Sequence, residues 1–210
     1  FAALSLAKTK QVSELVKWAD GKPIWMSWKL DGLTLVVTYD EGKLTKIVTR
    51  GNGHIGTNIT HLAPAIKGVL PTISEKGHLV IRGEAVISYA DFERFLIETE
   101  GDYANPRNLA SGSLTLKDVD EVKQRRIQWI PFTLVYTEKD INSWGERMQF
   151  LDEMGFQTVE RVDIQQPTTD NIQADIDAFT LKVTQNVNPF PVDGLVITYD
   201  DTQFASTGSV

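Results

Sequence analysis

The sequence predicts an α+β domain in which packed, mainly antiparallel sheets are flanked by helices. Two observations support this prediction. Short segments with apolar residues at every second position are mixed with segments whose apolar residues recur every third or fourth position. The two kinds of segment do not follow the regular strand–helix–strand order of a parallel sheet. A length of 210 residues suits one large domain, or one and a half ordinary ones.

The predicted strands begin with residues 24–30, in which Met26 and Trp28 share one face and Lys29 and Asp31 share the other. Two more strands follow closely, and turn-like residues separate the second strand from the third. We therefore expect a meander with hairpin turns. The other predicted strands are residues 33–39, 44–50, 78–86, 127–136 and 195–199.

Capping residues mark most of the predicted helices. Ser88 with Asp91, and Ser143 with Glu146, have the spacing of a capping box at a helix start. The first of these helices is expected to end near residue 99, and the second at Gly155. The other predicted helices are residues 12–18, with Ser13 as a candidate cap, and residues 172–183.

The composition excludes several classes of function. Absence of cysteine removes disulfides, thiolate catalysis and cysteine-based zinc sites, and it is typical of a cytoplasmic protein. The sequence has no apolar run near the ~20 residues of a membrane helix, so no membrane partner is expected. The three histidines lack metal-ligand spacing, and no metal ligand is predicted in this chain. Because DNA binding depends on cations, the net charge of −7 means that any contact with DNA needs a local basic surface or further domains.

The first segment suited to chemistry is residues 29–32, which read Lys-Leu-Asp-Gly. Period-two geometry places Lys29 and Asp31 on the same side of a strand end, and Gly32 lets the backbone turn closely. A lysine amine becomes a nucleophile when burial or nearby cations lower its pKa. By itself the segment also fits an exposed lysine before a turn.

Two further segments combine arginine, glycine and a carboxylate. Residues 49–53 read Thr-Arg-Gly-Asn-Gly, and Arg50 with the exposed N–H groups of this loop would suit a phosphate or a nucleotide edge. A hairpin turn with a solvated arginine is the alternative. Residues 82–84 read Arg-Gly-Glu, and the carboxylate of Glu84 would accept hydrogen bonds from ribose hydroxyls. An intrastrand ion pair is the alternative there.

The last two segments lie later in the chain. Residues 105–113 are small and polar, and Arg107 would hold a phosphate with two parallel hydrogen bonds; the form of this segment is left open. Residues 193–198, entered through Asp-Gly, also read as a plain core strand. The tryptophans follow no base-stacking pattern, and we expect them in the core: Trp18, Trp25, Trp28, Trp129 and Trp144.

Taken in order, these segments resemble the adenylation (nucleotidyltransferase) domain of bacterial NAD-dependent DNA ligases. Residues 29–32 look like the nucleotidyl-acceptor motif, which ATP-dependent ligases and mRNA-capping enzymes share. Residues 49–53 and 105–108 look much more specific to the NAD group, and residues 82–84 and 193–197 follow in the family's order. The resemblance implies the nucleotidyltransferase fold of DNA ligases and capping enzymes.

The resemblance also implies a reaction in three steps. Lys29 attacks the α-phosphate of NAD+ and expels nicotinamide mononucleotide, AMP passes to the 5′-phosphate at a nick in double-stranded DNA, and the 3′-hydroxyl then seals the nick. Such phosphoryl transfer needs positioning and charge neutralisation, part of which Mg2+ would supply. The implied roles are orientation of the lysine, metal-bound water or ribose by Asp31, phosphate binding by Arg50 and Arg107, ribose binding by Glu84, and further cofactor contacts by Ser5, Leu6, Leu30 and Val196.

Four positions depart from the family's pattern. The family usually carries a lysine at Thr198, an arginine at Thr115, an acidic residue at Ser27 and an aspartate at Asn52. Losing two cations near a phosphate is expected to slow catalysis unless another cation, such as Lys117, substitutes. Because the acceptor motif is intact, we favour a divergent active subgroup.

By the family's standard, residues 1–210 are expected to be an adenylation-domain core truncated at both ends. The subdomain that captures the nicotinamide half would precede Phe1, and the last lysine-bearing motif, OB domain, zinc finger, helix-hairpin-helix and BRCT regions would follow Val210, so zinc is expected only there. A cytoplasmic monomer is expected. Two alternatives stay open, namely an ATP- or GTP-using nucleotidyltransferase (an RNA ligase or a capping enzyme) and a degenerate nucleotide-binding module.

Overall fold

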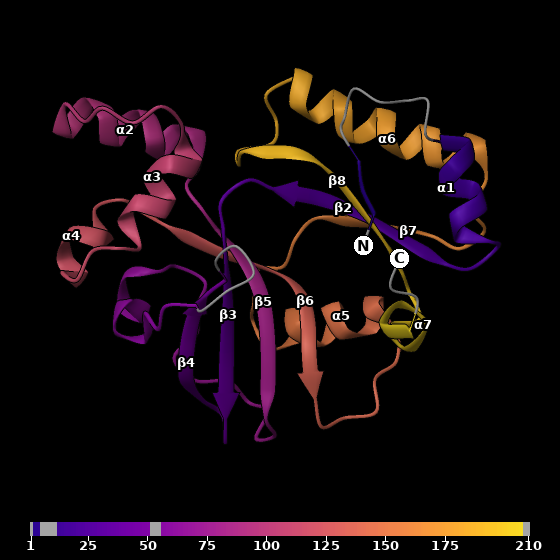
Figure 1. Ribbon diagram of the computed structural model, residues 1–210, viewed down its shortest axis with the longest axis horizontal. Helices are drawn as coiled ribbons and strands as arrows, with labels where there is room; N and C mark the ends of the chain where they lie inside the picture. Colours follow the sequence, from indigo (N-terminus) through magenta and orange to yellow (C-terminus); the bar gives the residue numbers. More distant parts are fainter. Residues whose placement is uncertain (1, 5–11, 51–55, 208–210) are drawn as a thin grey trace.

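Two four-stranded antiparallel sheets form the framework of the molecule, which confirms the predicted fold class (Figure 1). The computed structural model describes residues 2–4, 12–50 and 56–207. The first sheet has the strand order β1-β8-β2-β7, and the second has the order β4-β3-β5-β6. The strands are β1 (Ala2–Leu4), β2 (Ile24–Leu30), β3 (Leu33–Asp40), β4 (Lys43–Thr49), β5 (Leu79–Val86), β6 (Gln128–Thr137), β7 (Arg161–Ile164) and β8 (Val192–Tyr199).

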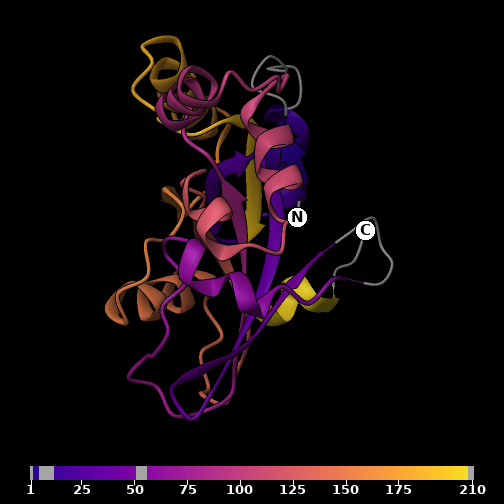
Figure 2. The ribbon, with the colours of Figure 1, turned by 90° about the vertical axis from the view of Figure 1, so that its left-hand side faces the viewer.

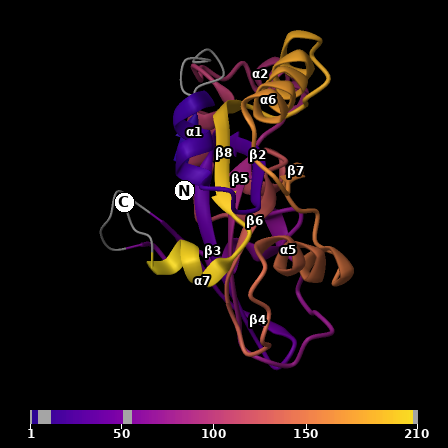
Figure 3. The same cartoon turned by 90° about the vertical axis from the view of Figure 1, so that its right-hand side faces the viewer.

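Helices flank both sheets. α1 and α6 pack on each other beside the first sheet, and α5 packs on β6 of the second (Figures 1 and 3). α2, α3 and α4 gather at one end of the second sheet, where α3 contacts β3 and β5 (Figure 2). The helices are α1 (Val12–Ala19), the 3₁₀ helix η2 (Thr60–Ala65), α2 (Tyr89–Thr99), α3 (Pro106–Ser113), α4 (Val119–Lys123), α5 (Trp144–Glu153), α6 (Thr169–Thr184) and α7 (Thr202–Thr207). Among the described helices, none combines the length and apolar character needed to cross a bilayer.

The link between β2 and β3 carries the chain from one sheet to the other. β2 pairs with β7 and β8, whereas β3 pairs with β4 and β5, so the predicted meander is correct for β3 and β4 and wrong for β2. Gly32 lies in this link, and a Cβ there would stand 2.0 Å from the carbonyl oxygen of Ala85 in β5. The two backbones approach so closely that a side chain has no room between them.

Hydrogen bonds confirm two of the predicted helix starts. Ser88 Oγ accepts from the backbone N–H of Asp91, and Ser143 Oγ accepts from that of Glu146. The candidate cap Ser13 is wrong, because α1 begins one residue earlier. A serine inside the first turn no longer occupies the position from which its hydroxyl reaches the unpaired N–H groups.

The segment whose form was left open is a helix. In α3 the side chain of Asn105 accepts from the backbone N–H of Asn108, and Pro106 occupies the first turn, where its missing N–H costs no hydrogen bond. The periodicity of the sequence missed the short elements β1, η2, α4, β7 and α7. Segments of three to six residues contain too few repeats to show a period.

One face of strand β2 packs into the core of the first sheet, and its other face borders the space between the two sheets. Met26 is fully buried, and the Trp28 ring lies 4.7 Å from that of Phe179 in α6, in an edge-on contact. These residues alternate with Ser27 and Lys29, which therefore point to the opposite side, as predicted. This alternation places the Lys29 side chain in the space between the two sheets.

Candidate active site

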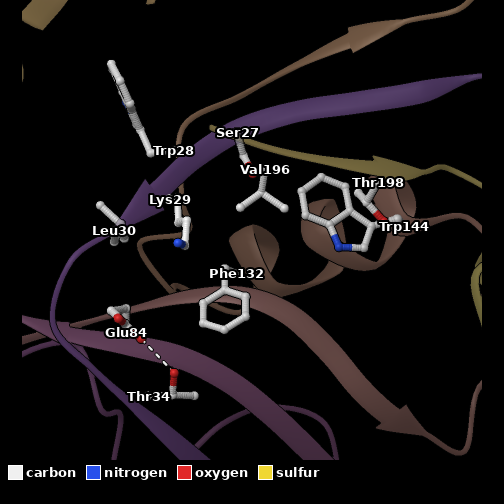
Figure 4. A pocket seen from close by; sticks show the side chains of 10 residues that line it. All are labelled: Ser27, Trp28, Lys29, Leu30, Thr34, Glu84, Phe132, Trp144, Val196 and Thr198. Carbon is white, nitrogen blue, oxygen red and sulfur yellow. Dashed lines mark hydrogen bonds between the residues drawn. The ribbon is translucent and has the colours of Figure 1, made fainter. Parts of the chain in front are cut away.

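A pocket of about 240 Å³ lies between the two sheets (Figure 4). The strands β2 and β8 supply one wall, β3, β5 and β6 supply the other, and the start of α5 adds a tryptophan. Most of its surface is apolar, as in ligand sites where a few polar groups fix orientation. The lining residues are Ser27, Trp28, Lys29, Leu30, Thr34, Glu84, Phe132, Trp144, Val196 and Thr198.

Lys29 lies at one end of this pocket, opposite Trp144 in Figure 4. Its side chain is 45 % exposed, and its Nζ lies 3.5 Å from a carboxylate oxygen of Asp193. The amine therefore pairs with an anion at half exposure. Asp193 is the extra residue of a bulge between β2 and β8, where Lys29 pairs with Gly194 and Leu30 with Val192. Such bulges redirect a side chain out of the regular strand alternation.

Asp31, two residues after Lys29, forms an ion pair with Arg107. The backbone N–H of Asp31 donates to the carbonyl of Pro191, which fixes the first residue after β2 against the start of β8. Its carboxylate lies 3.5 Å from Nε of Arg107, which α3 carries in its first turn. The Arg107 side chain is 61 % exposed and does not line the pocket, so a phosphate outside the pocket could reach it.

Glu84 lines the pocket from β5. Its carboxylate accepts from the Thr34 hydroxyl at 2.8 Å and from the backbone N–H of Gly32 at 3.1 Å. Burial raises the pKa of Glu84 to about 7, and the charges of Asp31 and Asp193 act in the same direction, against the two hydrogen bonds. Within the described residues Glu84 has no ion pair with Arg82, so the alternative of an intrastrand pair is not what the structure shows.

Arg50 lies beside the pocket but does not line it. Its backbone N–H donates to the carbonyl of Thr34, the residue whose hydroxyl binds Glu84. The Arg50 side chain is exposed. Burial lowers the pKa of Arg82, and the positive charge of Arg50 adds to this effect. The predicted loop residues 51–53, and the predicted contacts Ser5 and Leu6, lie outside the described residues.

Residues 5–208 match the family described as NAD-dependent DNA ligase adenylation domain. The chain belongs to this family. A DNA ligase of Lachnoclostridium phytofermentans is 37% identical over 98% of this chain, and one of Ruminiclostridium cellulolyticum is 39% identical over 97%. The chain spans about a third of the length of these relatives, namely 32% and 31%. A solved mycobacterial DNA ligase D complexed with ATP and MES covers 87% of this chain at 17% identity with a TM-score of 0.51; the chain covers 50% of that protein, and the likeness shows the fold.

Two of the departures from the adenylation-domain pattern fall inside the pocket. Ser27 and Thr198 are 4% and 5% exposed, and both line its walls. The position usually acidic and the position usually a lysine are therefore both neutral on the same surface. Thr115 is exposed after α3, where its hydroxyl donates to the carbonyl of Gly112 at 2.6 Å, and Lys117 is exposed nearby.

Sequence reasoning missed two aromatic residues of this adenylation domain's pocket. Phe132 lies in a nearly continuous apolar run of β6, residues 129–136 with only Thr133 polar, so its sequence context does not set it apart from core residues. Trp144 is 4% exposed, as the core prediction required, yet it also forms part of the pocket wall. Only the packing of β6 and α5 against the rest of the fold distinguishes these two side chains from ordinary core residues.

Magnesium has no preformed protein site in the described part of the chain. No group of three or more acidic or histidine side chains there is placed to hold an ion. The carboxylates nearest Lys29 already have partners: Asp193 pairs with Lys29, Asp31 with Arg107, and Glu84 with Thr34 and Gly32.

Proposed function

We propose that this chain carries the nucleotide-charging step of an NAD-dependent DNA ligase, with Lys29 as the AMP acceptor. The observation that carries the proposal is the position of the Lys29 amine at one end of a mostly apolar pocket that Glu84 also lines. The Nζ attacks the α-phosphorus of NAD+, a phosphorus–nitrogen bond forms, and the bond to nicotinamide mononucleotide breaks. The leaving group departs with its own phosphate.

The pocket suits the three parts of an adenylyl group. A purine fits between Phe132 and Val196, which lie on opposite sides of the space in Figure 4. The ribose hydroxyls reach the Glu84 carboxylate, and the phosphate lies toward Lys29. Outside the pocket, Arg107 and Arg50 neutralise phosphate charge; the proposal is supported by the exposed guanidinium of Arg107 beside Asp31 and by the backbone bond of Arg50 to Thr34.

In this proposal Asp31 is a positioning residue, whereas Asp193 both positions the amine and accepts its proton. Asp193 holds the Lys29 amine at 3.5 Å. The ammonium has to give up a proton before it can attack, and the Asp193 carboxylate lies where it can take that proton. Asp31 holds Arg107 at 3.5 Å and so keeps a cation beside the reacting phosphate. The AMP would then pass to the 5′-phosphate of a nick in double-stranded DNA, as expected for a ligase.

Intact-mass analysis of the full-length protein tests the proposal. We expect one adenylyl group to be added in the presence of NAD+ and Mg2+, mapping to Lys29 and absent from Lys29→Arg, which keeps the charge beside Asp193. Lys182→Arg is the matched control, because Lys182 also pairs with a carboxylate, Glu160, but does not line this pocket. An adduct with ATP and none with NAD+ would favour an ATP-using nucleotidyltransferase. No adduct, under conditions that charge a control ligase, would favour a binding module.

A further inference from the structure

Trp144 has an indole N–H without a partner in the wall of the pocket. It is 4% exposed, and Nε1 has no hydrogen bond in the described structure. The other buried tryptophans differ: Trp28 donates to Glu160 at 2.9 Å, and Trp129 donates to the carbonyl of Leu35 at 3.2 Å. A buried donor without an acceptor has lost its hydrogen bonds to water and has no protein bond to replace them, which costs free energy. In a residue that lines a pocket, such a group favours a ligand that carries an acceptor.

The surroundings of Trp144 hold the indole in place and leave it no acceptor. Trp144 is the first residue of α5, and its backbone N–H donates to the carbonyl of Asp200 at 2.6 Å. One carboxylate oxygen of Asp200 already accepts from Ser143, Gly145 and Trp25. The Trp25 ring packs 5.7 Å from that of Trp144. These hydrogen bonds and this ring packing therefore fix the position of the unpaired N–H.

The positions of Ser27, Lys29 and Trp144 indicate where the base of a bound nucleotide would lie. Ser27 and Lys29 are alternate residues on one face of β2, about 6–7 Å apart along the strand. In a nucleotide whose phosphate lies at Lys29, the base lies a comparable distance away, toward Ser27 and Trp144. Figure 4 shows Trp144 and Thr198 together at the end of the pocket opposite Lys29.

We propose that the Trp144 N–H donates a hydrogen bond to a ring nitrogen of the purine, which makes Trp144 a base-recognition residue. The inference rests on the proposed adenylyl function of the same pocket. An indole N–H only donates, so its partner has to be an acceptor. Ser27 has a hydroxyl that donates or accepts, and it completes the polar part of this end of the pocket.

AMP binding to the 210-residue chain, measured by calorimetry, tests the inference. Trp144→Phe is expected to weaken AMP binding about fivefold, the scale of one neutral hydrogen bond. Trp129→Phe, which loses a similar ring volume away from the pocket, is expected to leave AMP affinity unchanged. If Trp144→Phe does not fold, benzothienylalanine at position 144 keeps the ring size and removes the donor.

Base analogues separate a hydrogen bond from packing. We expect one of the 1-, 3- or 7-deaza forms of AMP to bind the wild type about fivefold more weakly, and to bind Trp144→Phe no more weakly than AMP does. An equal loss with all three analogues, or AMP affinity unchanged in Trp144→Phe, overturns the inference. Failure of Lys29 to form an adduct would leave this binding result intact, so the two proposals fail separately.

Discussion

The carboxyl of Glu84 should make ribose binding depend on pH near neutrality. Burial raises its pKa from 4.5 to about 7, so about half of the carboxyl groups are protonated at pH 7. An ionised carboxylate accepts hydrogen bonds from ribose hydroxyls more strongly than a protonated one. The perturbation that tests this is Glu84→Gln, which keeps the shape and fixes the side chain in a neutral form.

The expected size follows from the titration. The ionised fraction is about one-tenth at pH 6 and about nine-tenths at pH 8 for a pKa of about 7. If only the carboxylate binds well, affinity rises about tenfold over this range, and Glu84→Gln shows no rise. The free energy of unfolding should fall as the pH rises, opposite to the change in affinity. A raised carboxyl pKa stabilises the fold fully below pH 4.5, and this contribution is lost as pH rises through 7, at most about 1.4 kcal/mol per pH unit.

Calorimetric titration with adenosine is the appropriate assay, because adenosine has no group that titrates between pH 6 and 8. Glu75→Gln is the matched control. The Glu75 carboxylate also accepts from a backbone N–H, that of Gly77, but this bond lowers its pKa and Glu75 does not line the pocket. A wild-type affinity that stays flat or falls between pH 6 and 8 would refute the reasoning, as would a tenfold rise that survives in Glu84→Gln.

Three further predictions concern the same region. Gly32→Ala should lower the free energy of unfolding by about 1–3 kcal/mol in urea titrations and weaken AMP binding, because its Cβ would stand 2.0 Å from the Ala85 carbonyl oxygen. Gly112→Ala is the control and should be neutral or stabilising, because its Cβ meets only a Tyr103 carbon at 3.6 Å. Thr198→Lys, which adds a cation at a buried position (5% exposed) in the base end of the pocket, should tighten AMP binding in calorimetry by donating to the base and lower the unfolding midpoint, and unchanged affinity would mean that its ammonium does not reach the base. The 210-residue chain should bind AMP weakly and seal no nicks in a gel assay; sealing by this chain alone would contradict the expectation drawn from its resemblance to longer ligases.

Local pattern identified most of the framework. The alternation of β2 set Met26 and Trp28 against Ser27 and Lys29, and the structure confirms this division. Serine caps fixed the starts of α2 and α5, because a cap is a contact between residues three apart. The motif order also identified the family, which the match over residues 5–208 confirms.

The predicted site residues met different outcomes. Lys29, Leu30, Glu84 and Val196 line one pocket. Asp31 and Arg107 form a pair beside it, while the Arg50 side chain lies outside it and is exposed. The half exposure of Lys29 and its pairing with the Asp193 carboxylate depend on a bulge between β2 and β8 that no local pattern predicts.

The sequence by itself determined which residues alternate, which cap helices and which carry reactive groups, since these properties depend on neighbours within a few positions. Tertiary structure decided that β2 and β3 belong to different sheets, that Phe132 and Trp144 face the same space as Lys29, and that the Trp144 N–H has no partner. Pocket walls join residues more than a hundred positions apart. Their placement depends on packing between sheets, which a one-dimensional period does not encode.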